Sequence, residues 1–472
     1  MVFLTSKPNS SKVHSDAAAA FVLPRANLPS RQAIALISEH GDPAADIGRE
    51  EAGGQNVYVR QVGEALAKLG WKVDMFTRKS NADDPTIVQH SPYCRTVRLV
   101  AGPQEFVPRD QLFEYMPEFL EAFLTCQGKH HYPLIHTNYW MSAWVGLQVK
   151  QSQNVQLVNT YHSLGAVKYQ AVQDIPAIAS TRLAVERQIL EQAQCTVATS
   201  PQEHEMLRRL VSQTGHIEVI PCGTDIQNFH AIPKSEARAE LGLPSDEQIV
   251  LYVGRFDQRK GIETLVRAVA MLKHNATNTA KLRLVIVGGS EPGKSDYVER
   301  ERIGALVEML GLTENTLFAG RVGHDRLPLY YTAADVCVIP SHYEPFGLVA
   351  IEAMACGTPV VASDVGGLKF TVVPEETGLL VPPHHVEGFA AAINRILSDD
   401  IWTHKLRKRA SERVQQNFSW SGVAVQLSDL YRRLLAQEIM GEMLVPSQDN
   451  IAAASYAAKP IVLSAKSLTM AG

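Results

Sequence analysis

The sequence lacks several features that would narrow its function at once. No stretch of its 472 residues approaches the roughly 18 uninterrupted apolar residues of a membrane span. Its charge is nearly balanced, with 45 Lys and Arg residues against 49 Asp and Glu residues and a formal net charge of −4. One short basic cluster, residues 405–409, is predicted to be a solvated helix face. Because nucleic-acid binding needs a broader basic patch, nucleic acid is not the expected partner.

Metal and disulfide signatures are also missing. The six cysteines are scattered and form no C-x-x-C pair, which excludes the usual zinc and redox frameworks. The chain has no Asp-x-Asp motif, so a carboxylate clamp for a metal-bound diphosphate is not indicated. We therefore expect a cytoplasmic protein that needs no metal cofactor, although stimulation by Mg²⁺ stays open. The oligomeric state stays open as well.

The remaining composition is that of an ordinary globular protein with room for two domains. Residues 1–30 and 442–472 are rich in Ser and Ala without periodicity and are predicted to be flexible tails. Between them, short β-branched runs alternate with helical patterns, which is typical of parallel sheets covered on both faces. We predict an α/β protein of two doubly wound domains facing a cleft, residues 31–228 and 229–417. A helix within 418–441 would pack back across their junction. The predicted strands are 33–38, 72–77, 134–136, 155–160, 195–199, 217–220, 249–253, 282–287, 317–318, 336–339 and 359–362.

Two loops that follow predicted strands are suited to an anion. Residues 51–56, Glu-Ala-Gly-Gly-Gln-Asn, open a helix, and paired glycines there let the backbone approach a ligand at a helix N-terminus. A tight turn without a ligand is the alternative. In residues 254–261, Arg255 and Lys260 leave a strand end together, where a forked guanidinium and an ammonium group would neutralise a diphosphate. A solvated loop is the alternative there.

The most informative segment is 344–361, which carries two carboxylates. Glu344 precedes a predicted helix, and Glu352 lies about two turns further along the same side. The free amides of Gly347 and Leu348 would point at an anionic or hydroxyl-rich ligand. Carboxylates are the usual acceptors for the vicinal hydroxyls of a sugar or ribose. A surface helix with two glutamates fits the apolar sequence around them poorly.

Taken in order, these three segments resemble family 4 of the retaining glycosyltransferases, from about residue 31 to about residue 435. The resemblance implies the GT-B fold of two Rossmann-like domains and a nucleotide-sugar donor. It implies that Arg255 and Lys260 hold the diphosphate, that Glu352 binds the ribose, and that Glu344 and His162 contact the transferred sugar. The implied donor-binding residues are Gly53, Gly54, Arg255, Lys260, Arg321, Val322, Glu344, Phe346, Gly347, Leu348 and Glu352.

Two groups within this family look most similar, and both glycosylate a small phosphorylated acceptor. One is the sucrose-phosphate synthases, which use fructose 6-phosphate, and the other is the D-inositol 3-phosphate glycosyltransferases. Residues 113–119 resemble the first group, whereas Tyr139-Trp140 resembles the second. Arg109 and Arg182 would hold the acceptor phosphate, although either arginine alone is typical of a surface ion pair. The implied acceptor-binding residues are His40, Gln55, Asn56, Arg109, Tyr139, Ser163 and Arg182.

The resemblance implies retaining hexosyl transfer from a UDP-linked sugar, with His162, Glu344, Arg255 and Lys260 at the reacting centre. UDP-glucose suits the first group and UDP-N-acetylglucosamine the second. A structural histidine is the alternative for His162. A lipid-linked or polysaccharide acceptor would predict a basic helix on the first domain, and none is evident. A non-catalytic sensor on this fold would be expected to lose one of the charged residues above, yet all are present.

Overall fold

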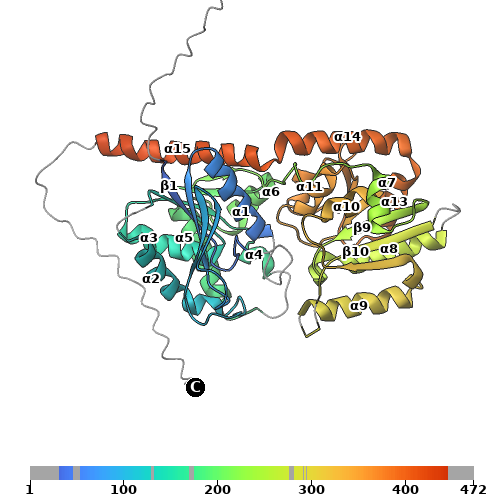
Figure 1. Cartoon of the computed structure of the whole chain (residues 1–472), viewed down its shortest axis with the longest axis horizontal. Helices are drawn as coiled ribbons and strands as arrows, with labels where there is room; N and C mark the ends of the chain where they lie inside the picture. Colours follow the sequence, from blue (N-terminus) through green and yellow to red (C-terminus); the bar gives the residue numbers. More distant parts are fainter. Residues whose placement is uncertain are drawn as a thin grey trace, which may run out of the picture.

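The computed structural model describes residues 31–45, 54–128, 132–169, 175–275, 281–290, 292–293 and 295–444 (Figure 1). Gly53, the predicted N-terminal tail and residues 445–472 of the predicted C-terminal tail lie outside these residues. The described chain forms two α/β halves, each built around its own sheet. Within the described residues, no helix combines the length and the apolar character needed to cross a bilayer.

The first sheet has eight strands in the order β3-β4-β2-β1-β5-β6-β7-β8. All of its neighbouring strands pair in parallel except β3 and β4; in the β1–β2 pair, for example, Ile34 lies opposite Val73. Strands β5, β6 and β7 are buried along their whole length, as expected for strands covered on both faces. The bounds are β1 Ala33–Ile37, β2 Lys72–Arg78, β3 Ile87–Ser91, β4 Cys94–Leu99, β5 Leu134–Asn138, β6 Gln156–Thr160, β7 Cys195–Ala198 and β8 Ile217–Val219.

The pair β3 and β4 corrects the prediction of purely parallel sheets. The two strands are antiparallel, and residues 92–93 join them at the edge of the sheet. Strand β3 is exposed or half-buried at every position, with polar Gln89 and His90 in its sequence. Because an edge strand of this kind has no apolar run, its pattern resembles that of a loop.

The second sheet has six strands in the order β11-β10-β9-β12-β13-β14, all parallel. This order, with the neighbouring β9 and β12 at its centre, confirms the predicted doubly wound arrangement. Strand β14 was not predicted, because it is short and begins with glycine. The bounds are β9 Glu247–Val253, β10 Lys281–Val287, β11 Thr316–Gly320, β12 Val336–Ile339, β13 Val360–Ser363 and β14 Gly378–Val381.

Helices cover both sheets, and their ends follow local sequence signals. Helix α6 begins with a Ser200 cap whose hydroxyl accepts from the Glu203 amide, followed by proline. In the first half the helices are α1 Gly54–Lys68, α2 Met116–Gln127, α3 Trp140–Ser152, α4 Gly165–Lys168, α5 Ala179–Gln192 and α6 Pro201–Leu210. The later helices are α7 Lys234–Leu241, α8 Ile262–Asn275, α9 Ser295–Met309, α10 Leu327–Ala333, α11 Leu348–Ala355, α12 Leu368–Thr371, α13 Val386–Ser398, α14 Asp400–Asn417 and α15 Trp420–Leu444.

The last two helices tie the halves together. They run along one side of the molecule, α14 over the second half and α15 over the first (Figure 1). At the crossing, the Thr224 amide donates to the Phe418 carbonyl at 2.7 Å. Further along α15, the Trp71 indole donates to the Ser428 hydroxyl at 2.9 Å. The C-terminal helix is therefore part of the first half's core.

Candidate active site

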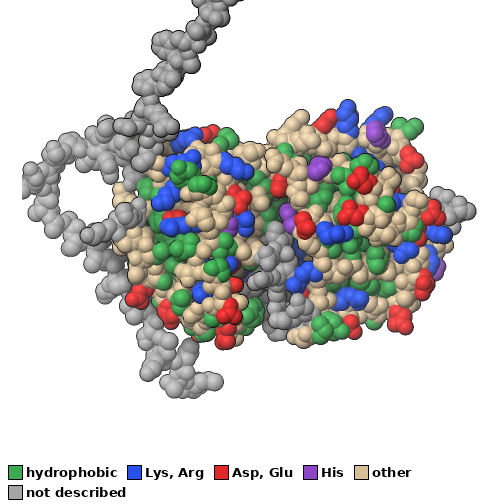
Figure 2. Space-filling view, in the orientation of Figure 1, with side chains coloured by type: hydrophobic (Ala, Val, Ile, Leu, Met, Phe, Trp, Pro, Cys, Tyr) green, Lys and Arg blue, Asp and Glu red, His purple; other side chains and the backbone are tan. Residues whose placement is uncertain are grey.

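The predicted site residues follow the carboxyl ends of strands from both sheets. In the first half they come after β1, β5 and β6, and in the second half after β9, β11 and β12. In space-filling view a furrow separates the halves, with basic and histidine side chains at its edge (Figure 2). In open α/β sheets, ligands bind outside the carboxyl ends of strands. The furrow is therefore the candidate active site.

The loop after β9 places two cations in the furrow. Arg255 is exposed and forms no side-chain hydrogen bond or ion pair within the described residues. Lys260 is half-buried, and its Nζ donates to Glu344 Oε2 at 2.6 Å. The loop thus offers one uncommitted guanidinium and one ammonium group held by a carboxylate.

Helix α11 and the loop before it carry the two predicted carboxylates. Gly347 starts the helix with φ 96°, in the left-handed region that favours glycine, and a Cβ there would lie 2.6 Å from Leu368 Cδ2. Glu352 is buried and accepts a 2.7 Å hydrogen bond from the Tyr331 hydroxyl. His324 Nε2 lies 3.7 Å from its other oxygen. Glu352 is therefore a positioned acceptor with one oxygen already bonded.

The N-termini of α1 and α11 meet across the furrow. A Cβ added to Gly54, the first residue of α1, would lie 3.1 Å from Leu348 Cδ1 at the start of α11. Phe346, just before α11, is buried against Phe418 with ring centroids 5.8 Å apart. Two helix ends that favour negative charge are thus brought together between the halves.

A cavity of about 300 Å³ opens beside the ends of β10 and β11. Arg321 lines it and is exposed, and the next residue, Val322, is half-buried. Its wall includes Phe318, over which the Arg300 guanidinium lies 3.5 Å from the ring centroid. A flat wall of this kind suits a planar ring. Arg321, which was predicted to line the nucleotide base, therefore lines this cavity.

His162 follows β6, with a strained backbone and a side chain whose surroundings favour the neutral imidazole. Its φ of 57° is uncommon for a residue with a side chain. Nε2 lies 2.9 Å from Asn138 Oδ1, and because an amide oxygen only accepts, this nitrogen carries the ring proton. Burial lowers the pKa of His162 to about 3. The ring therefore acts as a neutral hydrogen-bonding group rather than as a cation.

Arg182 is buried within α5 instead of lying on the surface. Its Nε donates to Glu186 Oε1 at 2.7 Å, Nη1 to the Tyr139 hydroxyl at 3.1 Å and Nη2 to the Ser163 carbonyl at 2.7 Å. The same Nη2 lies 3.4 Å from the Ser163 hydroxyl. Guanidinium has five N–H donors, and these four contacts do not engage one N–H of Nη1. The structure thus brings together three of the predicted acceptor residues.

The other predicted acceptor residues lie on the same side of the furrow. His40 Nδ1 is 2.5 Å from Glu39 Oε1, and its ring packs edge-on against Tyr139 with centroids 4.7 Å apart. Gln55 Nε2 donates to the Ser38 hydroxyl at 2.9 Å, and Asn56 Nδ2 donates to the Asp42 carbonyl at 3.0 Å. These two amides hold the loop after β1 against the start of α1.

Lys168 lies close to predicted acceptor-side residues and was not among the predicted site residues. It ends the short helix α4 and is half-buried. Burial lowers the pKa of Lys168, and the guanidinium groups of Arg182, Arg109 and Arg259 lower it further, against the opposing Asp110. Arg109 itself is exposed, with its guanidinium 5.9 Å from the Tyr139 ring centroid. In sequence, only its position after the predicted contact Ser163 could have drawn attention to Lys168.

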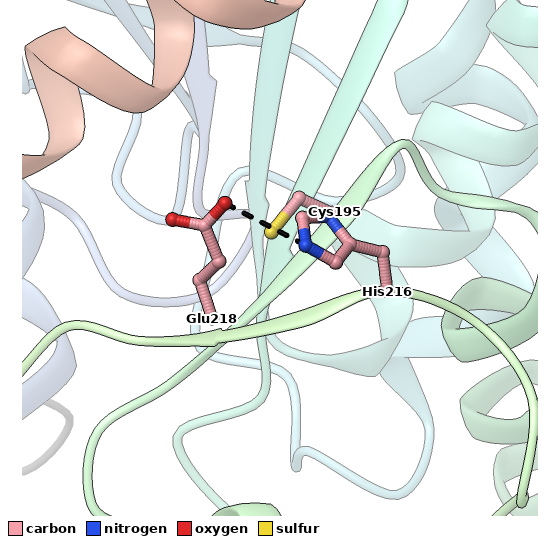
Figure 3. Close-up of side chains that lie close together, drawn as sticks. All are labelled: Cys195, His216 and Glu218. Carbon is pink, nitrogen blue, oxygen red and sulfur yellow. Dashed lines mark ion pairs between the residues drawn. The ribbon is translucent and has the colours of Figure 1, made fainter.

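The described residues contain one trio of potential metal ligands outside the furrow, Cys195, His216 and Glu218 (Figure 3). Their ligand atoms lie within 4.8 Å of one another. However, Arg433 on α15 donates to both carboxylate oxygens of Glu218, at 3.0 and 2.8 Å. Burial raises the pKa of Cys195 to about 12, which opposes formation of the thiolate that a metal needs. We interpret this trio as part of the anchor of α15.

Comparison with known proteins identifies the family of the chain. A family profile described as glycosyl transferases group 1 matches residues 233–417, and one described as glycosyl transferase 4-like domain matches residues 53–223. The D-inositol 3-phosphate glycosyltransferase of Kineococcus radiotolerans is 36% identical over 420 residues, which is 86% of this chain and 96% of that protein. The same enzyme of Acidothermus cellulolyticus is 37% identical over 411 residues, 86% and 91% of the two chains.

Solved structures share the arrangement of the two halves. The sucrose-phosphate synthase of Thermosynechococcus elongatus superposes with a TM-score of 0.80 and 57% identity, covering 86% of this chain and 100% of that one. Anabaena HepE, solved with UDP and glucose, has a TM-score of 0.66 and 21% identity over 84% and 99% of the two chains, and shows the fold alone. The predicted GT-B fold is thereby confirmed, and the chain belongs to family 4 of the glycosyltransferases.

Proposed function

We propose that this enzyme transfers glucose from UDP-glucose to fructose 6-phosphate with retention of the anomeric configuration. The observation that carries the proposal is the grouping of Arg109, Lys168 and Arg182 on the acceptor side of the furrow. Arg182 is paired with Glu186, and Lys168 interacts with Asp110 and Glu186 but also with the guanidinium groups of Arg182 and Arg109. An acceptor that carries a phosphate would add negative charge beside these three cations.

The donor would lie on the opposite side of the furrow. Arg255 and Lys260 would bind the diphosphate, next to the N-terminus of α11. Glu352, held by Tyr331, would accept from the ribose hydroxyls. Glu344 would accept from hydroxyls of the transferred sugar once the diphosphate competes for its partner Lys260. The base would occupy the cavity beside Arg321.

The reaction would be driven by stabilisation of the leaving group. As the bond between the anomeric carbon and the diphosphate oxygen breaks, Arg255, Lys260 and the α11 amides would stabilise the charge on that oxygen. The acceptor hydroxyl would attack from the same face and give its proton to a diphosphate oxygen. Neutral His162 would orient the sugar by a hydrogen bond, since a ring with its lowered pKa does not supply a proton near neutral pH. No metal would be needed, so chelation with EDTA is expected to leave the rate unchanged.

The degree of sequence similarity to known enzymes favours fructose 6-phosphate as the acceptor. The chain is 57% identical to a sucrose-phosphate synthase over that protein's full length, against 36% to a D-inositol 3-phosphate glycosyltransferase. Glycosyl transfer to inositol 3-phosphate from UDP-N-acetylglucosamine is the second candidate, because the same cations would hold either phosphate. Several curated relatives carry that name at 34–37% identity.

The test is nucleotide release by the purified protein with each donor and each acceptor. UDP-glucose and UDP-N-acetylglucosamine are each combined with fructose 6-phosphate, inositol 3-phosphate, fructose or no acceptor. Rapid release with UDP-glucose and fructose 6-phosphate, and with no other pair, is the expected result. Turnover with inositol 3-phosphate would replace the first candidate with the second. If the rate of UDP release did not depend on a phosphate group on the acceptor, both candidate functions would be overturned and a glycan or lipid-linked acceptor would be favoured.

A further inference from the structure

Glu39 is a buried carboxylate to which the reaction described above gives no role. It lies two residues after β1, and its side chain is fully buried beside the start of α3. Its Oε2 accepts from the Ser142 amide at 3.1 Å and from the Ser142 hydroxyl. The Glu39 amide donates in turn to the oxygen of that hydroxyl, at 3.1 Å. Because the amides at a helix N-terminus favour negative charge, the start of α3 holds this carboxylate in a fixed place.

The other carboxylate oxygen of Glu39 fixes the tautomer of His40. Glu39 Oε1 lies 2.5 Å from His40 Nδ1, and because a carboxylate oxygen only accepts, Nδ1 carries a proton. Burial lowers the pKa of His40, and Arg109 and Arg182 lower it further against the opposing effect of Glu39. The ring is therefore neutral near pH 7, with its lone pair on Nε2.

This lone pair has no partner in the protein. Within the described residues, His40 forms one side-chain hydrogen bond, the one from Nδ1 to Glu39. The two nitrogens of an imidazole ring point in different directions, so Nε2 points away from Glu39. The His40 side chain is 5% exposed, and Nε2 is not among the polar atoms that the described residues enclose completely. A hydrogen-bond donor from a small ligand can therefore approach it.

The ring of His40 lies among residues of the acceptor side of the furrow. It packs edge-on against Tyr139, and the Tyr139 hydroxyl accepts from Arg182 at 3.1 Å. His40 also lies near enough to His162 to contribute to the lowering of the pKa of His162. Because the neighbouring arginines can only donate, Nε2 supplies a hydrogen-bond acceptor next to them. A sugar or polyol hydroxyl is the kind of group that could use it.

We propose that Glu39 is a positioning residue, which holds His40 so that Nε2 accepts a hydrogen bond from a hydroxyl of the acceptor substrate. The inference rests on the proposed function, because it requires the acceptor to bind on this side of the furrow. It adds a contact to the ring of the acceptor that does not involve the phosphate. The contact orients the acceptor and transfers no proton, since the attacking hydroxyl gives its proton to a diphosphate oxygen.

Glu39→Gln tests the positioning role, because it keeps the shape of the side chain but reverses the tautomer of His40. The carboxamide oxygen would accept from Ser142, and the carboxamide nitrogen would donate to His40 Nδ1, which leaves the ring proton on Nε2. ¹⁵N NMR of protein labelled at histidine reads the tautomer, and the signals missing from His40→Phe are those of His40. We expect protonated Nδ1 in wild type and protonated Nε2 in Glu39→Gln. The same tautomer in both proteins would overturn the positioning role.

Steady-state kinetics with fructose 6-phosphate and with fructose test the contact to the acceptor. Glu39→Gln should lower kcat/KM by about tenfold for both acceptors, because a hydroxyl contact is common to them. His40→Phe should lower kcat/KM by at least as much. The double variant Glu39→Gln/His40→Phe should be no worse than His40→Phe, because Glu39 acts through His40. The affinity for UDP should stay at the wild-type value in all three variants.

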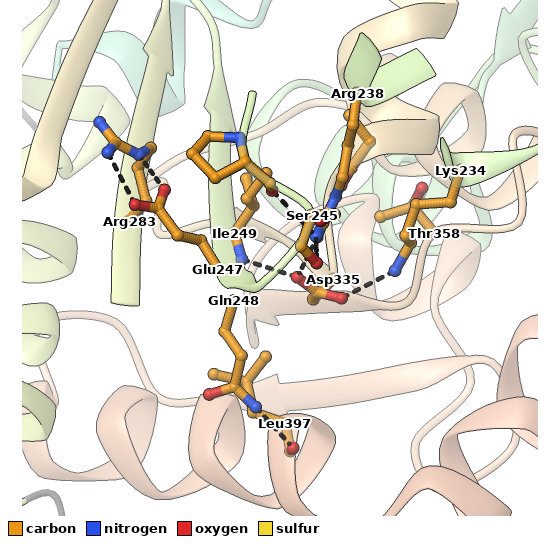
Figure 4. A network of polar contacts seen from close by, with 12 residues as sticks. Lys234, Arg238, Ser245, Glu247, Gln248, Ile249, Arg283, Asp335, Thr358 and Leu397 are labelled. Atoms are coloured by element: carbon orange, nitrogen blue, oxygen red, sulfur yellow. Dashed lines mark hydrogen bonds and ion pairs between the residues drawn. The ribbon is translucent and has the colours of Figure 1, made fainter. Parts of the chain in front are cut away.

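Glu247→Gln is the matched control and should keep wild-type kinetics. Glu247 is another buried carboxylate, but it starts β9 at the end of the sheet away from the furrow, where Arg283 holds it (Figure 4). Additive losses from Glu39→Gln and His40→Phe would give Glu39 a structural role only and overturn the proposal. A loss confined to fructose 6-phosphate would place His40 at the phosphate and overturn the hydroxyl contact.

Failure of the proposed function has a different signature. In that case wild type itself would turn over neither fructose 6-phosphate nor fructose, whereas the tautomer of His40 would still reverse in Glu39→Gln. The kinetic comparison of the variants would then use the acceptor that wild type does accept in the nucleotide-release assay. An unchanged kcat/KM of Glu39→Gln for that acceptor would overturn the contact.

Discussion

Lys260 Nζ lies 2.6 Å from Glu344 Oε2 and links the loop after β9 to the loop before α11. Neither side chain is fully exposed, so solvent screens this ion pair less than a surface pair. In the proposed reaction both partners have a ligand, the diphosphate for Lys260 and a sugar hydroxyl for Glu344. The ion pair therefore holds the two side chains in place before the donor binds in the proposed reaction.

Replacement of Lys260 tests its role in leaving-group stabilisation. Lys260→Ala is expected to lower kcat by about 10²-fold, since a placed donor to the developing charge is lost. Steady-state nucleotide release measures the effect. Lys408→Ala, which changes an exposed lysine on α14, is the control and should leave kcat unchanged. A Lys260→Ala enzyme with wild-type kcat would contradict the assignment.

The proposed ribose contact of Glu352 predicts a defect in donor binding. Glu352→Gln should weaken UDP binding by about tenfold, which is the loss of one hydrogen bond to a charged acceptor. Tyr331→Phe keeps the carboxylate but removes its 2.7 Å hydrogen bond, so a smaller loss is expected. Isothermal titration calorimetry with UDP measures both. If Glu352→Gln bound UDP as tightly as wild type, Glu352 would not contact the ribose.

Arg182 is expected to contribute to stability as well as to acceptor binding. Arg182→Ala leaves the buried Glu186 carboxylate without its partner and should lower the free energy of unfolding by about 3–5 kcal/mol. The double variant Arg182→Met/Glu186→Leu removes both charges and should recover part of this loss, while activity on a phosphorylated acceptor stays low. Urea unfolding and kinetics separate the two roles. Full activity of the double variant would exclude Arg182 from the acceptor site.

The stability of the protein should fall in mild acid because of His136. This ring is fully buried between the Tyr431 hydroxyl at 2.5 Å and the Thr160 hydroxyl at 2.8 Å, and burial lowers its pKa to about 3. Below pH 6.5 the unfolded chain binds a proton at His136 that the folded chain does not, so stability is lost as the pH falls. The expected loss from this residue is about 2 kcal/mol between pH 7.5 and pH 5.

Urea unfolding at pH 7.5 and pH 5 measures this loss in wild type and in His136→Gln. The variant should be less stable at pH 7.5, yet lose less stability on acidification. His404→Gln, which changes an exposed histidine, is the control and should follow wild type. An equal acid loss in wild type and His136→Gln would show that His136 is not the titrating group.

The sequence predicts many of the parallel strands well, because strands such as β1, β12 and β13 are nearly continuous apolar runs. It also places Arg255, Lys260 and Glu344 after strand ends, which the topology then brings to one furrow. The edge strand β3 was missed because it has no apolar face to detect. The surrounding fold holds the backbone of Tyr139 and His162 at positive φ. Neither residue type prefers this conformation, so it could not be predicted from the local sequence.

Lys168 and Arg407 illustrate the same limit for charged residues. Lys168 lies near Arg182 and Arg109 because the fold brings α4 close to α5 and to the loop that carries Arg109. Arg407 resembles its neighbours in the basic cluster, and only packing against α7 and the sheet distinguishes it. Charge alone therefore locates candidate residues, whereas tertiary contacts decide which of them are partly buried and which lie close to one another.

The most direct test of the account compares fructose 6-phosphate with fructose as acceptors, in wild type and in Lys168→Gln. The kcat/KM ratio of the two acceptors measures how strongly the furrow recognises the phosphate. We predict that the kcat/KM of wild type is at least about 10²-fold higher for fructose 6-phosphate than for fructose. In Lys168→Gln this ratio should be about tenfold smaller, because the KM for fructose 6-phosphate rises. Equal use of both acceptors by wild type, or an unchanged preference in Lys168→Gln, would contradict the proposed phosphate-binding acceptor site.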